Sequence, residues 1–124
     1  MPPDVVNFFP VLGDLAKAAL NLAEGVDVNW RVKEDDLWSG LHYAVDGNHG
    51  DLVDLILSQP RVDINIKTAH NATPLIVGCS EGYENIIRKL LQVKDIKLNC
   101  RCSIGNTALH YTASGNFSTC VELL

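Results

Sequence analysis

The sequence lacks the long apolar run of a membrane-spanning helix, which needs about 20 residues. The apolar stretch over residues 5–12 is much shorter, and Asn7 and Pro10 interrupt it. The sequence also lacks the basic start and the small-residue cleavage site of a secretory leader. We therefore expect an intracellular, cytoplasmic protein without membrane insertion, and a nuclear location stays open.

Basic residues are scarce as well. The chain has 10 Lys and Arg against 15 Asp and Glu, which gives a net charge of −5. Binding to a phosphate backbone needs clustered cations, but here only short basic spots occur, at Arg88-Lys89 and around Lys94 and Lys97. The charge balance predicts no nucleic-acid partner.

The few cysteines do not form a recognisable framework. Cys79 and Cys120 lie in apolar stretches of helical character, where a free cysteine acts as a small hydrophobe. Cys100 and Cys102 are separated by one residue, which is not the usual spacing of a structural zinc site, and no second pair follows. We expect a reducing compartment, two exposed thiols at Cys100 and Cys102, and no metal.

Motifs of catalysis are missing too. The sequence has no glycine-rich phosphate loop and no metalloprotease helix. His42 and His110 are candidate general bases, but no Ser or Cys nucleophile with an orienting carboxylate is fixed beside either of them. We therefore predict a protein that is not an enzyme and needs no cofactor.

What the sequence does have is an internal repeat. Leu41, Leu75 and Leu109 recur at a constant spacing of 34 residues, within the phrases S-G-L-H-Y-A, T-P-L-I-V-G and T-A-L-H-Y-T. A second phrase keeps the same phase, as V-D-V-N, V-D-I-N and I-K-L-N, and ends at Asn29, Asn65 and Asn99. Such a period is typical of stacked repeats, in which each unit covers its neighbour and a continuous core results.

The middle unit shows the structure of one repeat. Thr73 is a good helix cap and Pro74 fits the first helical position, so a short helix is expected to start there and to end at Gly82. A second helix follows with an apolar face, and the chain then enters an extended loop. The residues of that face are Ile86, Ile87, Leu90 and Leu91.

These phrases resemble the ankyrin repeat, whose motif reads T-P-L-H-x-A, then Gly-His, a leucine-rich second helix and G-A-D-V-N. The resemblance implies an all-α solenoid of helix-turn-helix units with hairpin-like finger loops, in one domain over residues 1–124. We divide the domain into a degenerate cap at 3–34, with helices near 4–9 and 15–22, two complete units at 35–70 and 71–104, and a shortened unit at 105–124. It further implies that His42 and His110 bond backbone between fingers.

The departures from the motif lie in turns and loops. Asn48 and Asn116 stand where glycine ends the first helix, and asparagine is the next most tolerant residue for a left-handed backbone. Leu37 and Asn71 replace the fingertip glycine that Gly105 retains. These positions leave the core intact and are open to function.

The resemblance also implies a non-catalytic module that binds another protein through a concave face of fingers and first helices. Trp and Tyr are common energetic anchors of such faces, although Trp38 could instead pack across repeats and Trp30 could cover the cap. The acidic fingertip at residues 34–36 is solvated and can steer a basic partner. The residues expected on this face are Trp30, Arg31, Trp38, Tyr43, Asp46, His70, Glu81, Arg101, Tyr111 and Ser114.

Three alternatives stay open. V-N-W at residues 28–30 and G-N-T-A-L-H-Y at 105–111 resemble repeats of small-GTPase-activating proteins and of nucleotide-activated ribonucleases, so the chain could be a regulatory segment of a larger enzyme or channel. In a ribonuclease of that kind, Trp38 would stack on a base. The shortened last helix offers a surface for self-association. Finally, Asn65 lies in a context similar to that modified by asparaginyl hydroxylases, whereas its plain role is to brace a finger through backbone hydrogen bonds.

Overall fold

The computed structural model describes residue 25 and residues 27–124. The helices expected near 4–9 and 15–22, and with them most of the cap unit, lie outside the described residues. The elements follow in the order β1 (Arg31–Val32), the short 3-10 helix η1 (Lys33–Asp35), β2 (Trp38–Ser39), α3 (Gly40–Asp46), α4 (Gly50–Leu57), α5 (Pro74–Glu81), α6 (Glu84–Leu91), α7 (Ala108–Ser114) and α8 (Ser118–Leu123).

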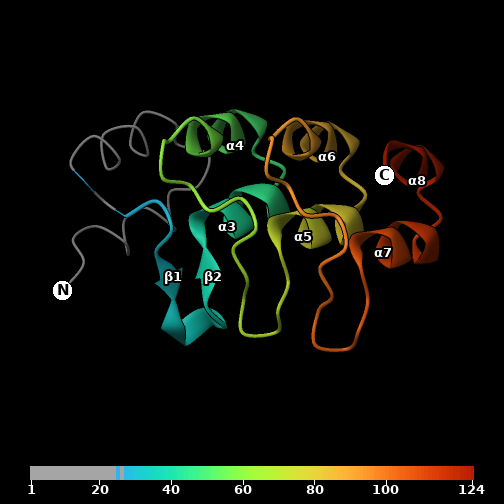
Figure 1. The fold of residues 1–124 in the computed structure, drawn as a ribbon, viewed down its shortest axis with the longest axis horizontal. Coiled ribbons are helices and arrows are strands. Elements are labelled where there is room, and N and C mark those ends of the chain that lie inside the picture. The colour runs from blue at the N-terminus through green and yellow to red at the C-terminus, as the bar shows by residue number, and fades with distance from the viewer. Residues whose placement is uncertain (1–24, 26) are drawn as a thin grey trace.

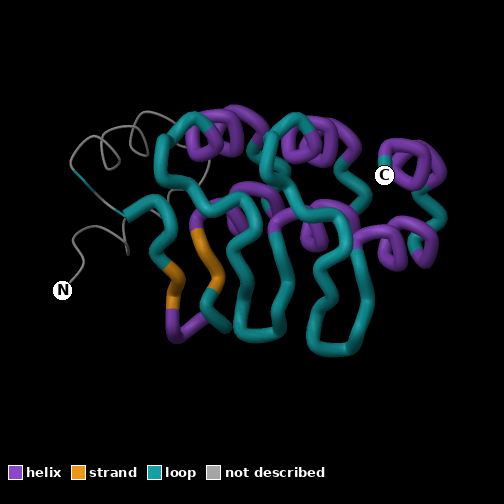
Figure 2. The backbone as a smooth tube through the Cα atoms, in the orientation of Figure 1, coloured by secondary structure: helices purple, strands orange, loops and turns teal. Residues whose placement is uncertain are grey.

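The helices stand in two rows, as predicted for an all-α solenoid (Figure 1). An inner row contains α3, α5 and α7, and an outer row contains α4, α6 and α8, with contacts between neighbours in each row and between the two helices of each unit. The fingers extend from the inner row on the side away from the outer row (Figure 2). The first finger carries the two-stranded antiparallel sheet, in which Val32 pairs with Trp38.

Each inner helix begins at a hydroxyl cap. The side chains of Ser39, Thr73 and Thr107 accept hydrogen bonds from the backbone N–H three residues later. Pro74 occupies the first turn of α5, where its missing N–H costs nothing. The cap that the sequence indicated at Thr73 therefore starts α5, and Ser39 and Thr107 do the same for α3 and α7.

The turns confirm the expected tolerance for a left-handed backbone. The inner helices are followed by residues with positive φ, namely Asn48 at 57°, Gly82 at 73° and Asn116 at 57°. The three fingertips share this conformation, with φ of 60° at Leu37, 61° at Asn71 and 86° at Gly105. Of these three residues leucine is the least suited to it, because glycine has no Cβ and the short polar side chain of asparagine can form local hydrogen bonds.

The core lies between the two rows, and its cover differs from unit to unit. Leu41 and Leu75 are each 1 % exposed, but the equivalent Leu109 is 48 % exposed. Leu75 lies in α5, which packs against both α3 and α7, whereas Leu109 lies in α7, which has an inner-row neighbour on one side in the described part of the chain. The repeated leucine is thus a core residue only where the next unit covers it.

Phe117 links the unit at 71–104 to the last unit and provides a first prediction. A Cβ added at Gly82 would lie 2.7 Å from the Phe117 ring, whereas one added at Gly105 would meet nothing within 4 Å. Both glycines have positive φ, so Gly105→Ala is expected to cost about 1 kcal/mol of unfolding free energy from the backbone alone. Gly82→Ala should cost about 2 kcal/mol more, because the ring must move.

The free energy of unfolding of both variants is measured by urea unfolding, with circular dichroism as the signal. The difference between them isolates the contact with Phe117, since the backbone term is common to both. Equal losses in the two variants would mean that the ring can move away at little cost.

Candidate functional site

Backbone hydrogen bonds between fingertips hold the fingers side by side. The Ala69 N–H donates to the Asp36 carbonyl at 2.7 Å, and the Ser103 N–H donates to the His70 carbonyl at 2.8 Å. These two bonds repeat at equivalent positions of successive units, so the described fingers form one continuous surface beside the inner helices (Figure 1).

Trp38 and Tyr43 meet where the first finger joins its inner helix, and we call this pair the aromatic corner. Trp38 comes from β2 and Tyr43 from α3, and their ring centroids are 5.3 Å apart with planes tilted by 50°. The Trp38 ring also lies 5.6 Å from the ring of His42. Both residues of the corner remain half-buried.

His42 has a structural role, as expected. Its Nδ1 takes part in the capping box with Ser39, and its Nε2 lies 2.9 Å from the carbonyl oxygen of Ala72 in the next finger. Burial lowers the pKa of His42 to about 4, so the ring is neutral and can donate to that carbonyl. His110 forms the same capping box with Thr107, but it is exposed and no bond from its Nε2 to a next finger exists within the described residues.

Two carboxylates of the predicted face lie at the ends of neighbouring inner helices. Asp46 ends α3 and Glu81 ends α5, and both are exposed. Burial, followed by the charges of Glu81 and Asp46 and a hydrogen bond with Glu81, raises the pKa of Tyr83. The carboxylates therefore lie near one tyrosine hydroxyl, although they are separated by a full repeat in the sequence.

In the last unit Tyr111 contacts a thiol of the finger that leads into α7. The Tyr111 hydroxyl lies 3.3 Å from Cys102 Sγ, and Cys100 and Cys102 are both half-buried, so the expectation of two exposed thiols is wrong. Partial burial acts to raise the pKa of Cys102, but hydrogen bonds from Tyr111 and from the backbone N–H of Ile104 and Asn106 lower it overall. Tyr111 is thus anchored to its own finger.

The predicted arginines and the fingertip histidine bind within the chain. Arg31 Nη1 donates to the Lys67 carbonyl at 3.0 Å, and Arg101 Nη1 donates to the Gly105 carbonyl at 3.2 Å. His70 Nε2 lies 3.7 Å from a carboxylate oxygen of Asp36, with both side chains largely exposed. The remaining predicted residues, Trp30 in the turn before β1 and Ser114 at the end of α7, are exposed.

Asn65 braces the next unit through backbone atoms. Its Nδ2 donates to the Asp95 carbonyl at 2.9 Å, and its Oδ1 accepts from the Lys97 N–H at 2.9 Å. Asn29 makes the same pair of bonds one unit earlier, to the Arg61 carbonyl and from the Asp63 N–H. This is the bracing role that the sequence indicated, and it engages both polar atoms of the amide.

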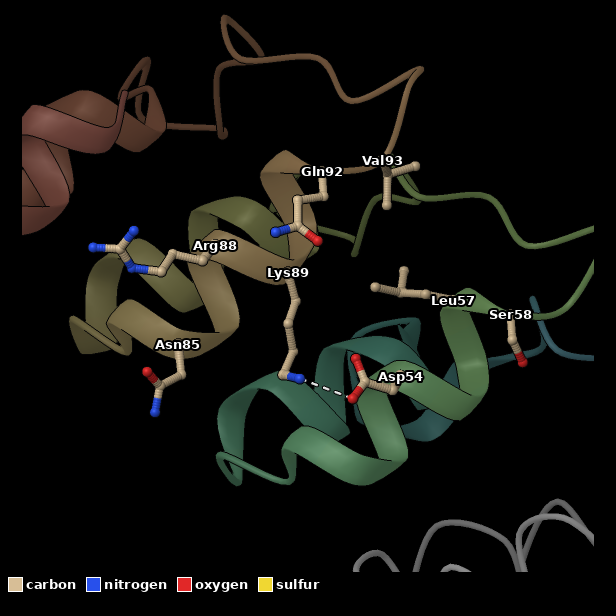
Figure 3. A pocket seen from close by; sticks show the side chains of 8 residues that line it. All are labelled: Asp54, Leu57, Ser58, Asn85, Arg88, Lys89, Gln92 and Val93. Atoms are coloured by element: carbon tan, nitrogen blue, oxygen red, sulfur yellow. Dashed lines mark hydrogen bonds and ion pairs between the residues drawn. The ribbon is translucent and has the colours of Figure 1, made fainter.

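A groove between the outer helices was not predicted. It has a volume of about 640 Å³ and lies between α4 and α6, where Lys89 Nζ and Asp54 Oδ2 form an ion pair at 2.8 Å (Figure 3). Arg88, on the same groove, is paired with Glu84 at 2.8 Å. Two charges that satisfy each other leave little to attract a ligand. No sequence signal marks this groove, because its walls come from two different units.

The described part of the chain contains neither a candidate metal site nor a candidate membrane-spanning helix. No group of three or more His, Cys, Asp or Glu side chains in residues 25 and 27–124 could hold a metal ion. None of the helices in that part is long and apolar enough to cross a membrane.

Comparison with known proteins gives relatives of very different kinds. The chain is 28% identical over 156 residues to the poly(ADP-ribose) polymerase tankyrase of Caenorhabditis elegans, a match that covers 89% of this chain and 7% of that protein. It is 34% identical to alpha-latrotoxin-Lhe1a of Latrodectus hesperus, over 63% of this chain and 6% of the toxin. It is 28% identical to the E3 ubiquitin-protein ligase XBAT33 of Arabidopsis thaliana, over 69% of this chain and 17% of the ligase.

The chain therefore spans a small part of each of these relatives, and what it shares with them is the repeat. A family model for ankyrin repeats, in three copies, matches residues 12–102 and residues 41–124. Together with the stacked helix pairs, the hydroxyl caps and the fingers, these matches show that the chain belongs to the ankyrin-repeat family.

Proposed function

We propose that this chain binds a protein partner through its concave face, which we define as the surface of the fingers and of the inner helices α3, α5 and α7. Ankyrin repeats are in general modules of protein–protein interaction. The observation that supports the choice of face is the aromatic corner, where Trp38 and Tyr43 stay half-buried although Leu41, which lies between them in the chain, is fully covered.

A preformed surface favours tight binding. The fingers are joined by backbone bonds and the inner helices by packing, so a partner would find the contact residues already in place and little order would be lost on binding. Partly exposed aromatic rings supply a large contact area at a low cost in rotamer entropy. The face therefore fits a non-catalytic role in which the chain holds another protein.

A selection of random peptides displayed on phage tests this proposal. Selected peptides should bind the intact chain, and Trp38→Ala should weaken them by about tenfold or more, which is the effect of removing an aromatic anchor. Asn85→Ala, on the exposed outer groove, is the control and should leave binding unchanged. Circular dichroism checks that both variants keep their helices. Binding that is insensitive to Trp38 and lost in the control would place the partner on the outer side.

Two of the alternatives stay predictions with their own tests. A regulatory segment of a larger enzyme or channel predicts further repeats or a catalytic domain in the full-length sequence, and a thermal-shift screen against nucleotides tests the ribonuclease version. Self-association through α8 predicts a dimer in light scattering. Extension by one further repeat should abolish that dimer if the exposed Leu109 and Val121 form its contact.

Hydroxylation of Asn65 is a separate proposal. The residue is half-buried and its amide is engaged at both ends, so a hydroxylase would first have to free it from the next unit. Incubation with an asparaginyl hydroxylase and 2-oxoglutarate should add the mass of one oxygen atom to the chain and none to an Asn65→Ala variant. An unchanged intact mass would remove the proposal.

A further inference from the structure

We propose that the aromatic corner is a recognition site for an arginine side chain of the partner, with the guanidinium stacked on Trp38 and its charge directed to Asp46. This inference rests on the proposed function and names the chemistry of the partner, a basic segment. It is carried by three features of the described residues: the shape of the corner, the charges of the inner helices and the state of the neighbouring cations.

The corner presents two half-buried aromatic rings. Two rings tilted by 50° at a centroid distance of 5.3 Å form an angle instead of a closed stack. A cation placed against such rings is attracted by their electron-rich faces, and tryptophan is the strongest of the aromatic residues in this respect. The Trp38 ring also lies 5.6 Å from the ring of His42, which is neutral and so does not repel an incoming cation.

The inner helices carry negative charge only. Asp46 and Glu81 are the charged residues of α3, α5 and α7, which contain no Lys or Arg. Asp46 follows Tyr43 by three residues in α3, so the two side chains lie on the same side of the helix. A guanidinium held against the Tyr43 ring would therefore have the carboxylate of Asp46 on the same side of α3.

Neither of these carboxylates has an ion-pair partner within the part of the chain that the structure describes. The ion pairs of the described residues join His70 to Asp36, Arg88 to Glu84 and Lys89 to Asp54, and none includes Asp46 or Glu81. Two cations of the fingers, Arg31 and Arg101, direct their Nη1 atoms to backbone carbonyls. The acidic fingertip at residues 34–36 lies on the same finger as Trp38 and adds to the attraction of a basic segment.

Arginine suits this site better than lysine or an apolar side chain. Its planar guanidinium can stack on a ring and at the same time form a bidentate contact with a carboxylate, which a lysine ammonium cannot do. An apolar side chain would cover the rings but would remove water from Asp46 without replacing its hydrogen bonds.

The experiment uses the peptides selected on the intact chain. Each peptide that binds is synthesised with its arginines replaced singly by citrulline, which keeps the shape and removes the charge. We expect one citrulline in each peptide to raise the Kd for the wild-type chain by about tenfold or more, as for the loss of a hydrogen bond between charged groups. The same exchange should have a much smaller effect, about twofold, on Asp46→Asn, because the two changes remove one interaction.

Controls separate this inference from the proposed function. Trp38→Leu should lose most of the preference for arginine, and Asn85→Ala on the outer groove should keep it. Selected peptides that depend on Trp38 but contain no critical arginine would overturn the inference and leave the proposed function standing. An arginine whose effect is the same in wild type and in Asp46→Asn would also overturn it. If no peptide is enriched, or if all bind independently of the concave face, both proposals fail.

Discussion

Leu75→Ala is expected to lower the free energy of unfolding by about 3 kcal/mol, because it removes a side chain that is 1 % exposed between two neighbouring units. Leu109→Ala, the same change at the same motif position, should lower it by about 1 kcal/mol, because 48 % of that residue is already exposed. Urea unfolding of both variants, followed by far-ultraviolet circular dichroism, measures the two losses.

The comparison is sensitive to how the units are arranged. Side-chain chemistry, helix position and capping residue type match between the two sites, so the difference reports the cover that a following unit provides. Equal losses would mean that Leu109 is covered in solution, for example by a second copy of the chain. A dependence of the Leu109 result on protein concentration would identify that case.

Acidification is expected to destabilise the chain through His42. Burial holds the pKa of this residue at about 4, against 6.5 for an exposed histidine, so between these values the unfolded chain binds a proton that the folded chain does not. The free energy of unfolding should therefore fall as the pH drops from about 6.5 to about 4. Below about pH 4 the contribution of His42 should change no further. The total loss from this group is about 3 kcal/mol.

His110 supplies the matched control for this effect. It occupies the same motif position and makes the same capping box, but it is exposed. His42→Gln should flatten the fall in stability between about pH 6.5 and 4, whereas His110→Gln should leave it unchanged. A pH dependence that survives in His42→Gln would assign the effect to other groups. Chemical unfolding at several pH values measures the free energy of unfolding of the wild type and of both variants.

Local signals carried the prediction of the fold. Thr73 and Pro74 define the start of a helix by their own hydrogen-bonding capacity, and Asn48 and Asn116 reveal a left-handed turn because few residues tolerate one. Asn65 could be given a bracing role because its phrase recurs in phase with the helices. Each of these properties depends on a residue and its near neighbours, which the sequence displays directly.

The candidate site was predictable in position but not in its contacts. The repeat placed Trp38 and Tyr43 on one face, yet nothing in the spacing indicates that their rings touch at 5.3 Å or that Trp38 also contacts His42. The Cys102 thiol was expected to be exposed to solvent. Its contact with Tyr111 depends on the packing of a finger against α7, which the sequence does not display. Asp46 and Glu81 likewise come together through the packing of two units.

The asparagine braces have a consequence for how such a chain can change in evolution. Asn29 and Asn65 hold the next unit by a carbonyl oxygen and an N–H, which are groups that nearly every amino acid provides in its main chain. The alignment of successive units therefore does not depend on the side chains of the braced loops. We therefore expect substitutions of the exposed braced residues Asp63 and Lys97, other than by proline, to leave the register of successive units unchanged.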